Sequence, residues 1–390
     1  AELKSRSAAG GRMITNLQLK NFTAFSELTI DFSPGINIII GENGTGKTQL
    51  LKAILALSGP EARAEQAGEQ LARKLCRLYH PLGGQVGELR RAGARGEAML
   101  SATFASGQEM TAKFSGKATT AKVSANMDGD LAAAIFIPTK EVLSLVRGLT
   151  AEQPDQPTIE RIFDDGYLDL ARQLAKEGMG DLDAKVQFDP RFASIVPRLA
   201  NLIGGRYELH NGRFCFQAGE YVEKLGRSGS AQKAAQTFQD SALRFVPGKS
   251  PLLSSGMTAE GFRKIGVLQR LLSNGSLNPG TSGPLLWDEP ESNLNPKLMR
   301  DLVQALLELA RNGQQIILAT HDYVLLKWFD LLMDKGEGDH VVFHRLYRTE
   351  GEENVRHESQ SDYSIVGRSA ISNAFAELYD EDVKRALGGD

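Results

Sequence analysis

The chain has 390 residues, of which 41% are hydrophobic and 24% charged, as is typical of a globular protein with a substantial core. Its 45 basic and 48 acidic residues give a net charge of −3, which excludes a strongly basic nucleic-acid coat but leaves room for a local basic patch. No apolar run approaches the roughly 18 residues of a membrane helix, and no secretory signal is visible. The two cysteines have no zinc-binding spacing, which is ordinary for a protein of the reducing cytoplasm. We expect a cytoplasmic protein, and we expect no membrane partner.

The first part of the chain predicts strands, a loop and a helix. Residues 1–12 have no apolar period, and we interpret them as a leader or tag. Met13–Lys20 and Leu28–Phe32 alternate apolar and polar residues, as antiparallel strands do. The run Ile36–Ile40 predicts a strand buried on both faces, and after a glycine-rich turn Gln49–Leu57 carries the apolar face of a helix.

The middle of the chain is less regular. Residues 97–127 alternate through several short strands, and 132–137 predict another buried strand. Charged and apolar residues over 159–203 predict two helices. Asn211-Gly212 predicts a tight hairpin turn, and residues 226–250 are interpreted as a mobile surface segment because they are rich in Gly, Ser, Lys and Gln.

Regular patterns return in the last third of the chain. Thr258–Leu272 predicts a helix and Pro284–Trp287 a short strand. Pro296–Ala310 predicts a second helix, with proline in its first turn, and Gln315–Ala319 a second strand. No heptad pattern is sustained over several turns, and no internal repeat is visible.

One segment matches the phosphate-loop pattern G-x-x-x-x-G-K-[ST]: Gly41, Glu42, Asn43, Gly44, Thr45, Gly46, Lys47 and Thr48. It follows a predicted buried strand and opens, at Gln49, into a predicted helix, which is the context that phosphate binding requires. Lys47 would neutralise the β- and γ-oxygens, and the Thr48 hydroxyl would ligate Mg²⁺. We therefore expect ATP and Mg²⁺ as cofactors.

Two carboxylates end the predicted strand before Pro290. Asp288 stands where a Mg²⁺ ion beside a phosphate loop needs an oxygen ligand, and we expect it to reach the ion through water. Glu289 points to the other side because side chains alternate along a strand, and we predict that it is the general base for the attacking water. His321 follows the second predicted strand and is either a contact to the γ-phosphate or a structural histidine.

Together these segments resemble ABC-type ATPases. Gly41–Thr48 is similar to a Walker A motif, Leu285–Glu289 to a Walker B motif with its catalytic glutamate, Ser292–Pro296 to a D-loop, and His321 to a switch histidine. The early run Leu19–Phe22 resembles the start of the SMC, RecF and OLD branch rather than that of transporter subunits. This early run and the DEPE-x-NLNP run at Asp288–Pro296 are together similar to small stand-alone AAA-type ATPases of that branch. Many of those ATPases belong to bacterial anti-phage defence.

The resemblance implies roles for further residues. Three residues would lie near the nucleotide: Lys20, Asn21 and Phe22. His321 becomes a sensor of the γ-phosphate, and Asn293 and Asn295 would lie at a dimer interface. The family's glutamine after the 132–137 strand is missing, and Thr139 and Glu141 are the candidates for its place.

The family's signature motif, which caps the γ-phosphate of a partner subunit, should precede the Walker B strand by one helix. Two segments are candidates. The first, Thr258-Ala259-Glu260-Gly261, opens the helix directly and fits better. The second, Ser254-Ser255-Gly256, is nearer to a serine-glycine form of the motif. Neither segment has the full signature sequence, so the sequence does not decide which of them would contact the nucleotide of a partner subunit.

The implied fold is α/β: an ABC-type P-loop NTPase head with a mixed parallel core sheet, an antiparallel β subdomain and a helical insert. We expect a first ATPase lobe over 13–148, a helical and hairpin insert over 149–250 and a second lobe over 251–390. The stretch after His321 is too short for the nuclease domain of full OLD proteins, so nuclease or toxin activity is expected on a separate chain.

The expected function is an ATP-hydrolysing switch that dimerises head to head around ATP·Mg²⁺, with higher assemblies open. It would control a separate effector protein, a nuclease or toxin, in bacterial defence or DNA maintenance. One alternative is a RecF-like DNA-binding repair ATPase, for which a set of basic residues could form a face: Arg90, Arg91, Arg95, Lys113, Lys117 and Lys122. The other alternative is the ATPase subunit of a membrane transporter.

Overall fold

The computed structural model describes residues 12–63, 66–126, 133–150, 156–178, 182–224, 242–349, 351, 354–368 and 370–387. The predicted leader, apart from its last residue, lies outside the described residues. So does most of the segment predicted to be mobile. Within the described residues no helix combines the length and the apolar character needed to cross a membrane.

A six-stranded sheet carries the site. Its strands, in spatial order, are β15 (Val355–Gln360), β14 (Val341–Arg348), β3 (Ile36–Gly41), β13 (Ile316–Thr320), β12 (Leu285–Asp288) and β7 (Ile135–Ile137). All neighbours pair in parallel except β15, which is antiparallel to β14. Every residue of β3, β12 and β13 is buried, as expected for parallel strands covered on both faces. The predicted α/β fold class with a mixed core sheet is confirmed.

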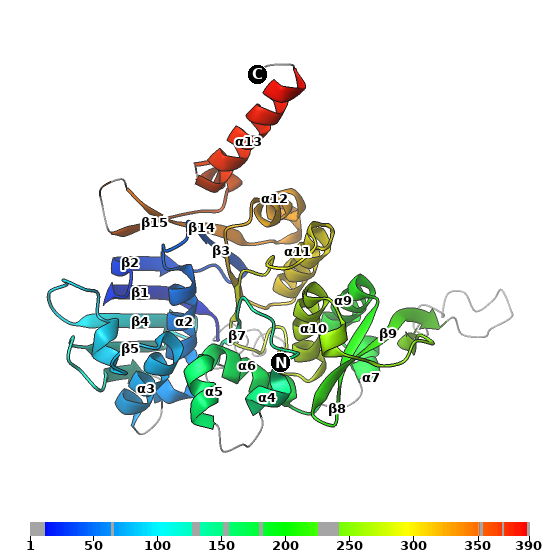
Figure 1. Ribbon diagram of the computed structural model, residues 1–390, viewed down its shortest axis with the longest axis horizontal. Helices are drawn as coiled ribbons and strands as arrows, with labels where there is room; N and C mark the ends of the chain where they lie inside the picture. The colour runs from blue at the N-terminus through cyan, green and yellow to red at the C-terminus, as the bar shows by residue number, and fades with distance from the viewer. Residues whose placement is uncertain are drawn as a thin grey trace.

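A second, antiparallel sheet lies beside the first (Figure 1). Its strands, in spatial order, are β2 (Phe25–Asp31), β1 (Ile14–Phe22), β4 (Ala98–Phe104), β5 (Glu109–Phe114) and β6 (Lys122–Asn126). Helix α2 (Lys47–Ser58) lies between the two sheets, and its Leu50, Leu51 and Ile54 belong to a core that takes side chains from both. Helix α3 (Ala67–Tyr79) packs beside α2. The helix that follows the phosphate loop is therefore held by apolar contacts on two sides.

The segment between β7 and the second half of the chain is more divided than the sequence predicted. Two helices were expected over 159–203, but five described helices occupy it: α5 (Gln156–Ile162), α6 (Asp165–Ala175), α7 (Leu182–Phe188), α8 (Pro190–Ala193) and α9 (Ile195–Ile203). The divisions have local causes, because Asp164 caps α6 and Asp189 caps α8, where Pro190 opens the helix. A short helix, α4 (Val146–Thr150), precedes them.

A third sheet contains the predicted hairpin. Its strands are β8 (Gly205–His210), β9 (Arg213–Lys224), β10 (Ala242–Pro247) and β11 (Leu253–Ser254). The Asn211-Gly212 turn is confirmed, with both residues at positive φ (49° and 72°), as a two-residue hairpin loop demands. The assignment of 226–250 to an irregular segment is wrong for Ala242–Pro247, which pairs with β9 through all six residues.

Four longer helices complete the second half: α10 (Glu260–Ser273), α11 (Pro296–Arg311), α12 (Tyr323–Leu332) and α13 (Ala370–Ala386). Single 3₁₀ turns lie at Pro60–Arg63, Val86–Leu89, Ser255–Met257, Lys335–Glu337 and Tyr363–Arg368. The bounds of α10 and α11 agree with the sequence prediction within two residues. Helix α13 extends away from the rest of the molecule (Figure 1). The expected division into lobes at 148 and 250 remains a prediction.

Candidate nucleotide-hydrolysis site

The predicted site residues meet at one edge of the parallel sheet. Strand β13 lies between β3 and β12, and the register pairs Thr320 with Ile40 and Asp288 with Ala319. The carboxyl ends of the three strands are therefore level with one another. Loops at this edge of an open α/β sheet are where ligands bind. The phosphate loop, the acidic pair and His321 all leave the sheet here.

The phosphate loop depends on glycine at defined positions. Gly44 and Gly46 have φ values of +81° and +93°, in the left-handed region that favours glycine. A Cβ on Gly46 would lie 2.6 Å from Cζ of Phe25, and one on Gly41 would lie 2.5 Å from the carbonyl oxygen of Leu346. The loop is therefore both bent and closely covered, and larger residues would displace it.

Lys47 is folded into this loop. Its Nζ donates hydrogen bonds to the carbonyl oxygens of Gly41 at 2.7 Å and Glu42 at 3.2 Å, and its side chain is buried. Burial lowers the pKa of Lys47, while the carboxylates of Glu289 and Asp288 act in the opposite direction. An ammonium group in this place, with nearby acids, is suited to exchange its carbonyl partners for phosphate oxygens.

Three oxygen atoms converge beside the start of α2. Oγ1 of Thr48 donates to Oδ2 of Asp288 at 2.8 Å, and Oγ1 of Thr139 donates to the same oxygen at 3.0 Å. Burial raises the pKa of Asp288, while these two hydroxyl groups lower it. Hydroxyl and carboxylate oxygens are the ligands that Mg²⁺ prefers, so Thr48 and Asp288 are suited to hold the ion.

The two candidates for the missing glutamine lie in different places. Thr139 lies at the Asp288 carboxylate, as described above. Glu141 instead forms a buried ion pair with Arg263 of α10, with 2.8 Å between Oε1 and Nε. Thr139 is therefore the candidate that reaches the metal-binding side chains, and Glu141 joins this segment to helix α10.

Glu289 and His321 face each other across the strand ends. Nδ1 of His321 lies 3.0 Å from Oε1 of Glu289, and both side chains are partly exposed, 48% for His321 and 26% for Glu289. Glu289 has a φ of +48°, which is uncommon outside glycine, and its N–H donates to the carbonyl oxygen of Ala319 at 2.8 Å. The turn thus directs the carboxylate of Glu289 into the open edge, beside the imidazole.

A second glutamate lies behind this pair. Oε1 of Glu291 accepts a hydrogen bond from Oγ1 of Thr320 at 2.7 Å and lies 4.0 Å from Nδ1 of His321. Burial raises the pKa of Glu291 to about 7. Glu291 was not predicted as a site residue, although it stands three residues after Asp288 and two after Glu289 in the same acidic run.

A buried lysine connects helix α10 to the acidic turn. Lys264 is 1% exposed, and its Nζ donates to the carbonyl oxygen of Glu289 at 3.1 Å and to Oγ of Ser292. Oγ of Ser292 in turn donates to the carbonyl oxygen of Thr139 at 3.2 Å. Burial lowers the pKa of Lys264. The signal was in the sequence, because Lys264 stands on the apolar face of α10 beside Ile265.

Both signature candidates lie at the N-terminal end of α10, and the first of them contacts the D-loop segment. Oε1 of Glu260 accepts from Nδ2 of Asn293 at 2.9 Å, and a Cβ on Gly261 would lie 2.9 Å from the Asn293 carbonyl oxygen. Oγ1 of Thr258 donates to the carbonyl oxygen of Ser255 at 2.7 Å, which ties the two candidates together. Asn295 caps α11 through the N–H of Lys297 at 3.0 Å.

The comparisons with known proteins agree with this geometry. A family model described as AAA domain matches residues 16–96, and one described as AAA domain, putative AbiEii toxin, Type IV TA system matches residues 150–327. The DNA replication and repair protein RecF of Lactobacillus gasseri is 30% identical over 152 residues, covering 39% of this chain and 36% of that protein. Together these matches support a P-loop ATPase of the SMC/RecF family.

Other matches are shorter or more distant. RecF of Limosilactobacillus reuteri (strain DSM 20016) is 46% identical over 46 residues, which is 12% of each chain. A crystal structure of an Smc head bound to the C-winged helix domain of ScpA is 14% identical, covers 91% of this chain and 99% of that one, and has a TM-score of 0.49. The chain thus spans about a third or less of the length of the RecF relatives that it matches.

The SMC/RecF resemblance placed Lys20, Asn21 and Phe22 near the nucleotide. Phe22 is fully buried, and its ring packs against those of Tyr79 and Phe114, with centroids 5.4 and 6.4 Å apart, so its side chain belongs to the core. Lys20 is exposed on β1, and Asn21 donates from Nδ2 to the carbonyl oxygen of Arg95 at 3.0 Å. Their proximity to nucleotide remains a prediction.

The residues of this region that lie against the phosphate loop are Ala24 and Phe25, which the sequence analysis missed. Oε1 of Gln49 accepts a hydrogen bond from the N–H of Ala24 at 3.3 Å, and Phe25 covers Gly46. Arg348, at the end of β14, also reaches the loop and donates to the carbonyl oxygen of Gly44 at 2.9 Å. No local pattern marked Arg348, because only the pairing of β14 with β3 brings it here.

Proposed function

We propose that the chain binds ATP·Mg²⁺ and hydrolyses it at this edge of the sheet. The observation that carries the proposal is the convergence of Thr48, Asp288 and the Glu289–His321 pair at the mouth of the phosphate loop. Loop N–H groups and Lys47 would hold the phosphates, and Thr48 and Asp288 would hold Mg²⁺, which would supply positive charge to the phosphate oxygens. These residues would bind and orient the nucleotide before any chemical step.

Glu289 acts as the general base in this proposal. Its carboxylate accepts the proton of the attacking water as the oxygen bonds to the γ-phosphorus and the bond to the β-phosphate oxygen breaks, giving ADP and phosphate. His321, now 3.0 Å from Glu289, orients the carboxylate and stands ready to donate to a γ-phosphate oxygen. Asp288 is buried and accepts hydrogen bonds from the two threonine hydroxyl groups, so in this proposal it binds the metal and does not act as the base.

ATP also acts as a switch between separate and paired heads. Two surfaces support this proposal: the start of α10 and the D-loop. A Cβ on Gly256 would meet no atom within 4 Å, Met257 is 71% exposed, and Asn293 and Asn295 are exposed. A second head that placed these groups against the γ-phosphate would bind better with ATP than with ADP, and hydrolysis would release the pair. Larger assemblies are compatible with the same contact.

The setting we favour is bacterial defence or DNA maintenance, with a separate nuclease or toxin as the effector. Support comes from the matching family model, whose description includes a putative AbiEii toxin, and from the RecF relatives named for DNA replication and repair. A RecF-like DNA-binding ATPase is the second candidate. Its proposed basic face is weakened, because Arg90 donates to the carbonyl oxygens of Ala94 and Gly96, and Lys122 pairs with Glu97.

Glu289→Gln tests the hydrolysis proposal directly. We expect phosphate release to fall by roughly a hundredfold or more, since the general base is lost, while bound ATP and an ATP-dependent dimer persist in light scattering. Glu337→Gln, at an exposed glutamate paired with Arg311, is the matched control and should keep the wild-type rate. Hydrolysis by Glu289→Gln at the wild-type rate would show that the base has been assigned to the wrong residue.

The same variant tests the setting. Tagged Glu289→Gln protein held with ATP·Mg²⁺ would be recovered from the source cell, and its bound proteins and nucleic acid identified. A nuclease-like or toxin-like protein supports the effector proposal. DNA alone would favour the repair ATPase, and a membrane permease would favour the transporter alternative.

A further inference from the structure

Helix α13 exposes a row of large apolar side chains to solvent. Of the twelve exposed large hydrophobic residues in the described part of the chain, four lie on this helix, Phe375, Leu378, Tyr379 and Val383, and a fifth, Leu387, directly follows it. Leu378 is 65% and Tyr379 69% exposed. Apolar residues that cluster in this way, rather than being scattered singly, mark interaction sites. In proteins most helical stability comes from packing of an amphipathic face, and the body contacts α13 mainly through α12 and the turn Tyr363–Arg368.

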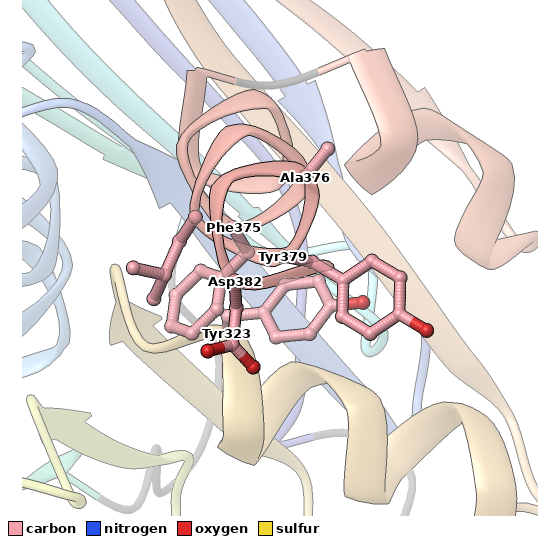
Figure 2. Close-up of a pocket in the computed structure, with 6 residues that line it drawn as sticks. Tyr323, Phe375, Ala376, Tyr379 and Asp382 are labelled. Carbon is pink, nitrogen blue, oxygen red and sulfur yellow. The ribbon is translucent and has the colours of Figure 1, made fainter. Parts of the chain in front are cut away.

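The row forms one wall of a hollow of about 670 Å³, lined by Tyr323, Phe375, Ala376, Leu378, Tyr379 and Asp382. The rings of Tyr323 and Phe375 stack with centroids 4.5 Å apart and hold the base of α13 against the start of α12. Figure 2 shows the aromatic side chains gathered on one side of the helix, with the Asp382 carboxylate among them. The hollow is therefore apolar with a single acidic group.

Asp382 interrupts the apolar spacing of the helix. Phe375, Leu378, Tyr379 and Val383 occupy positions i, i+3, i+4 and i+8 of one face, and Asp382 occupies i+7. Among the described residues, no lysine, arginine or histidine forms an ion pair with Asp382, whereas the neighbouring Glu381 pairs with Lys384 at 2.7 Å. Three further carboxylates lie within the same six residues, Glu377 to Asp382. A ligand for this face needs apolar side chains and a cation.

We propose that this α13 face, together with Tyr323, is the docking surface for a basic amphipathic helix of a partner protein. The apolar side of that helix would cover Leu378 and Tyr379, and a lysine or arginine within it would pair with Asp382. A second copy of this chain fits less well. Two α13 helices packed face to face would bring both acidic clusters together, and like charges placed in this way destabilise the contact.

The proposed docking surface lies close in sequence to the candidate hydrolysis site. Tyr323 is the first residue of α12 and lies two residues after His321, and Asp322 between them caps the helix by accepting from the N–H of Leu325 at 2.7 Å. A partner seated on Tyr323 thus touches the helix that begins two residues after the candidate γ-phosphate sensor, His321. The docking surface itself does not require ATP hydrolysis, so it can be tested separately from the proposed function.

Three synthetic helical peptides test the proposal. They share leucines on one face and differ only at the position facing Asp382, which is lysine, glutamine or glutamate. Fluorescence anisotropy with the full chain, without nucleotide, measures their affinities. We expect the lysine peptide to bind best, Asp382→Lys to weaken it by about tenfold and to strengthen the glutamate peptide, and Leu378→Ala to weaken both. Leu82→Ala, at an exposed leucine elsewhere, should change nothing.

Circular dichroism would establish that each variant is folded. The proposal is overturned if none of the three peptides binds, if all three bind equally, or if Asp382→Lys leaves their order unchanged. It is also overturned, in favour of a second copy, if the wild-type chain self-associates in sedimentation equilibrium and Leu378→Ala abolishes that association. Loss of peptide binding with ATP hydrolysis intact would reject the docking surface alone.

Discussion

Replacing Lys264 with methionine is expected to lower ATP turnover while leaving the protein folded. The lysine is 1% exposed, and its Nζ donates hydrogen bonds to the carbonyl oxygen of Glu289 and to the hydroxyl oxygen of Ser292. Methionine is similar in length and fills the same space without leaving a cavity. The substitution therefore removes the charge and the hydrogen bonds but little of the packing.

The stability terms of this substitution oppose each other. An unsatisfied Glu289 carbonyl or Ser292 hydroxyl costs about 1–3 kcal/mol. Against this, removing a buried ammonium group relieves a desolvation cost of several kcal/mol, the same burial that lowers the pKa of Lys264. We expect the free energy of unfolding to change by no more than about 2 kcal/mol.

The effect on turnover is not offset in this way. Without Lys264, the turn at Glu289, whose φ is +48°, loses the donor that holds it from the α10 side. A displacement of about 1 Å at a reacting group costs roughly a hundredfold in rate. Because Lys264 does not line the phosphate loop, kcat should fall by this order while KM for ATP changes little.

Phosphate-release kinetics and urea unfolding, measured on the same preparations, separate the two effects. Lys335→Met, at an exposed lysine, is the control and should match the wild type in both. Unchanged kcat in a folded Lys264→Met variant would refute the positioning role of Lys264. If Lys264→Met does not fold, Ser292→Ala removes only the hydroxyl that Lys264 contacts and should lower kcat in the same direction.

Three further changes have expected outcomes. Gly46→Ala should abolish binding of a fluorescent ATP analogue and lower the free energy of unfolding by about 1–3 kcal/mol, because φ is +93° and a Cβ would meet Phe25 at 2.6 Å. Thr139→Val should raise the Mg²⁺ concentration for half-maximal turnover by roughly tenfold, because Asp288 loses a hydroxyl donor; Thr139→Ser should restore it. Glu291→Gln should stabilise the nucleotide-free protein at high pH. Burial raises the pKa of Glu291 from 4.5 to about 7, so the folded state binds the extra proton between these values and wild-type stability falls as pH rises through them. The gain should reach about 3 kcal/mol above pH 7 and vanish below pH 4.5, as urea unfolding at about pH 5 and about pH 8 would show.

The sequence predicted those parts of the site that are formed by short, continuous segments of the chain. The phosphate loop follows a buried strand, and Asp288 and Glu289 end another. Parallel strands end at a common edge, so the sequence already implied that these groups and His321 would meet. The structure brings them together, and the predicted fold class and family are confirmed.

The contributions that the sequence did not reveal come from distant segments. Arg348 reaches the phosphate loop only because β14 pairs with β3. Thr139 was a candidate from the sequence, but only the pairing of β7 with β12 places it, rather than Glu141, at Asp288. The core packing of Phe22 was not visible in its own short run either, because it depends on Tyr79 and Phe114. Contacts that depend on the pairing of strands distant in sequence leave no local pattern in the sequence.

One chain of hydrogen bonds joins the start of α10 to the start of α2. Lys264 of α10 contacts Ser292, Ser292 contacts the backbone of Thr139, and the Thr139 hydroxyl contacts Asp288, which also accepts from Thr48. A partner head that pushed on the N-terminal end of α10 would therefore act on the metal-binding carboxylate and on the Glu289 backbone at once. The opposite side of the site ends in His321 and the Tyr323–Phe375 stack beneath α13. Contacts at α10 thus lead to Asp288 and the Glu289 backbone, and contacts at α13 lead to the segment that holds His321 beside Glu289. By these separate routes, the proposed nucleotide-dependent dimer and a partner protein could bias hydrolysis independently.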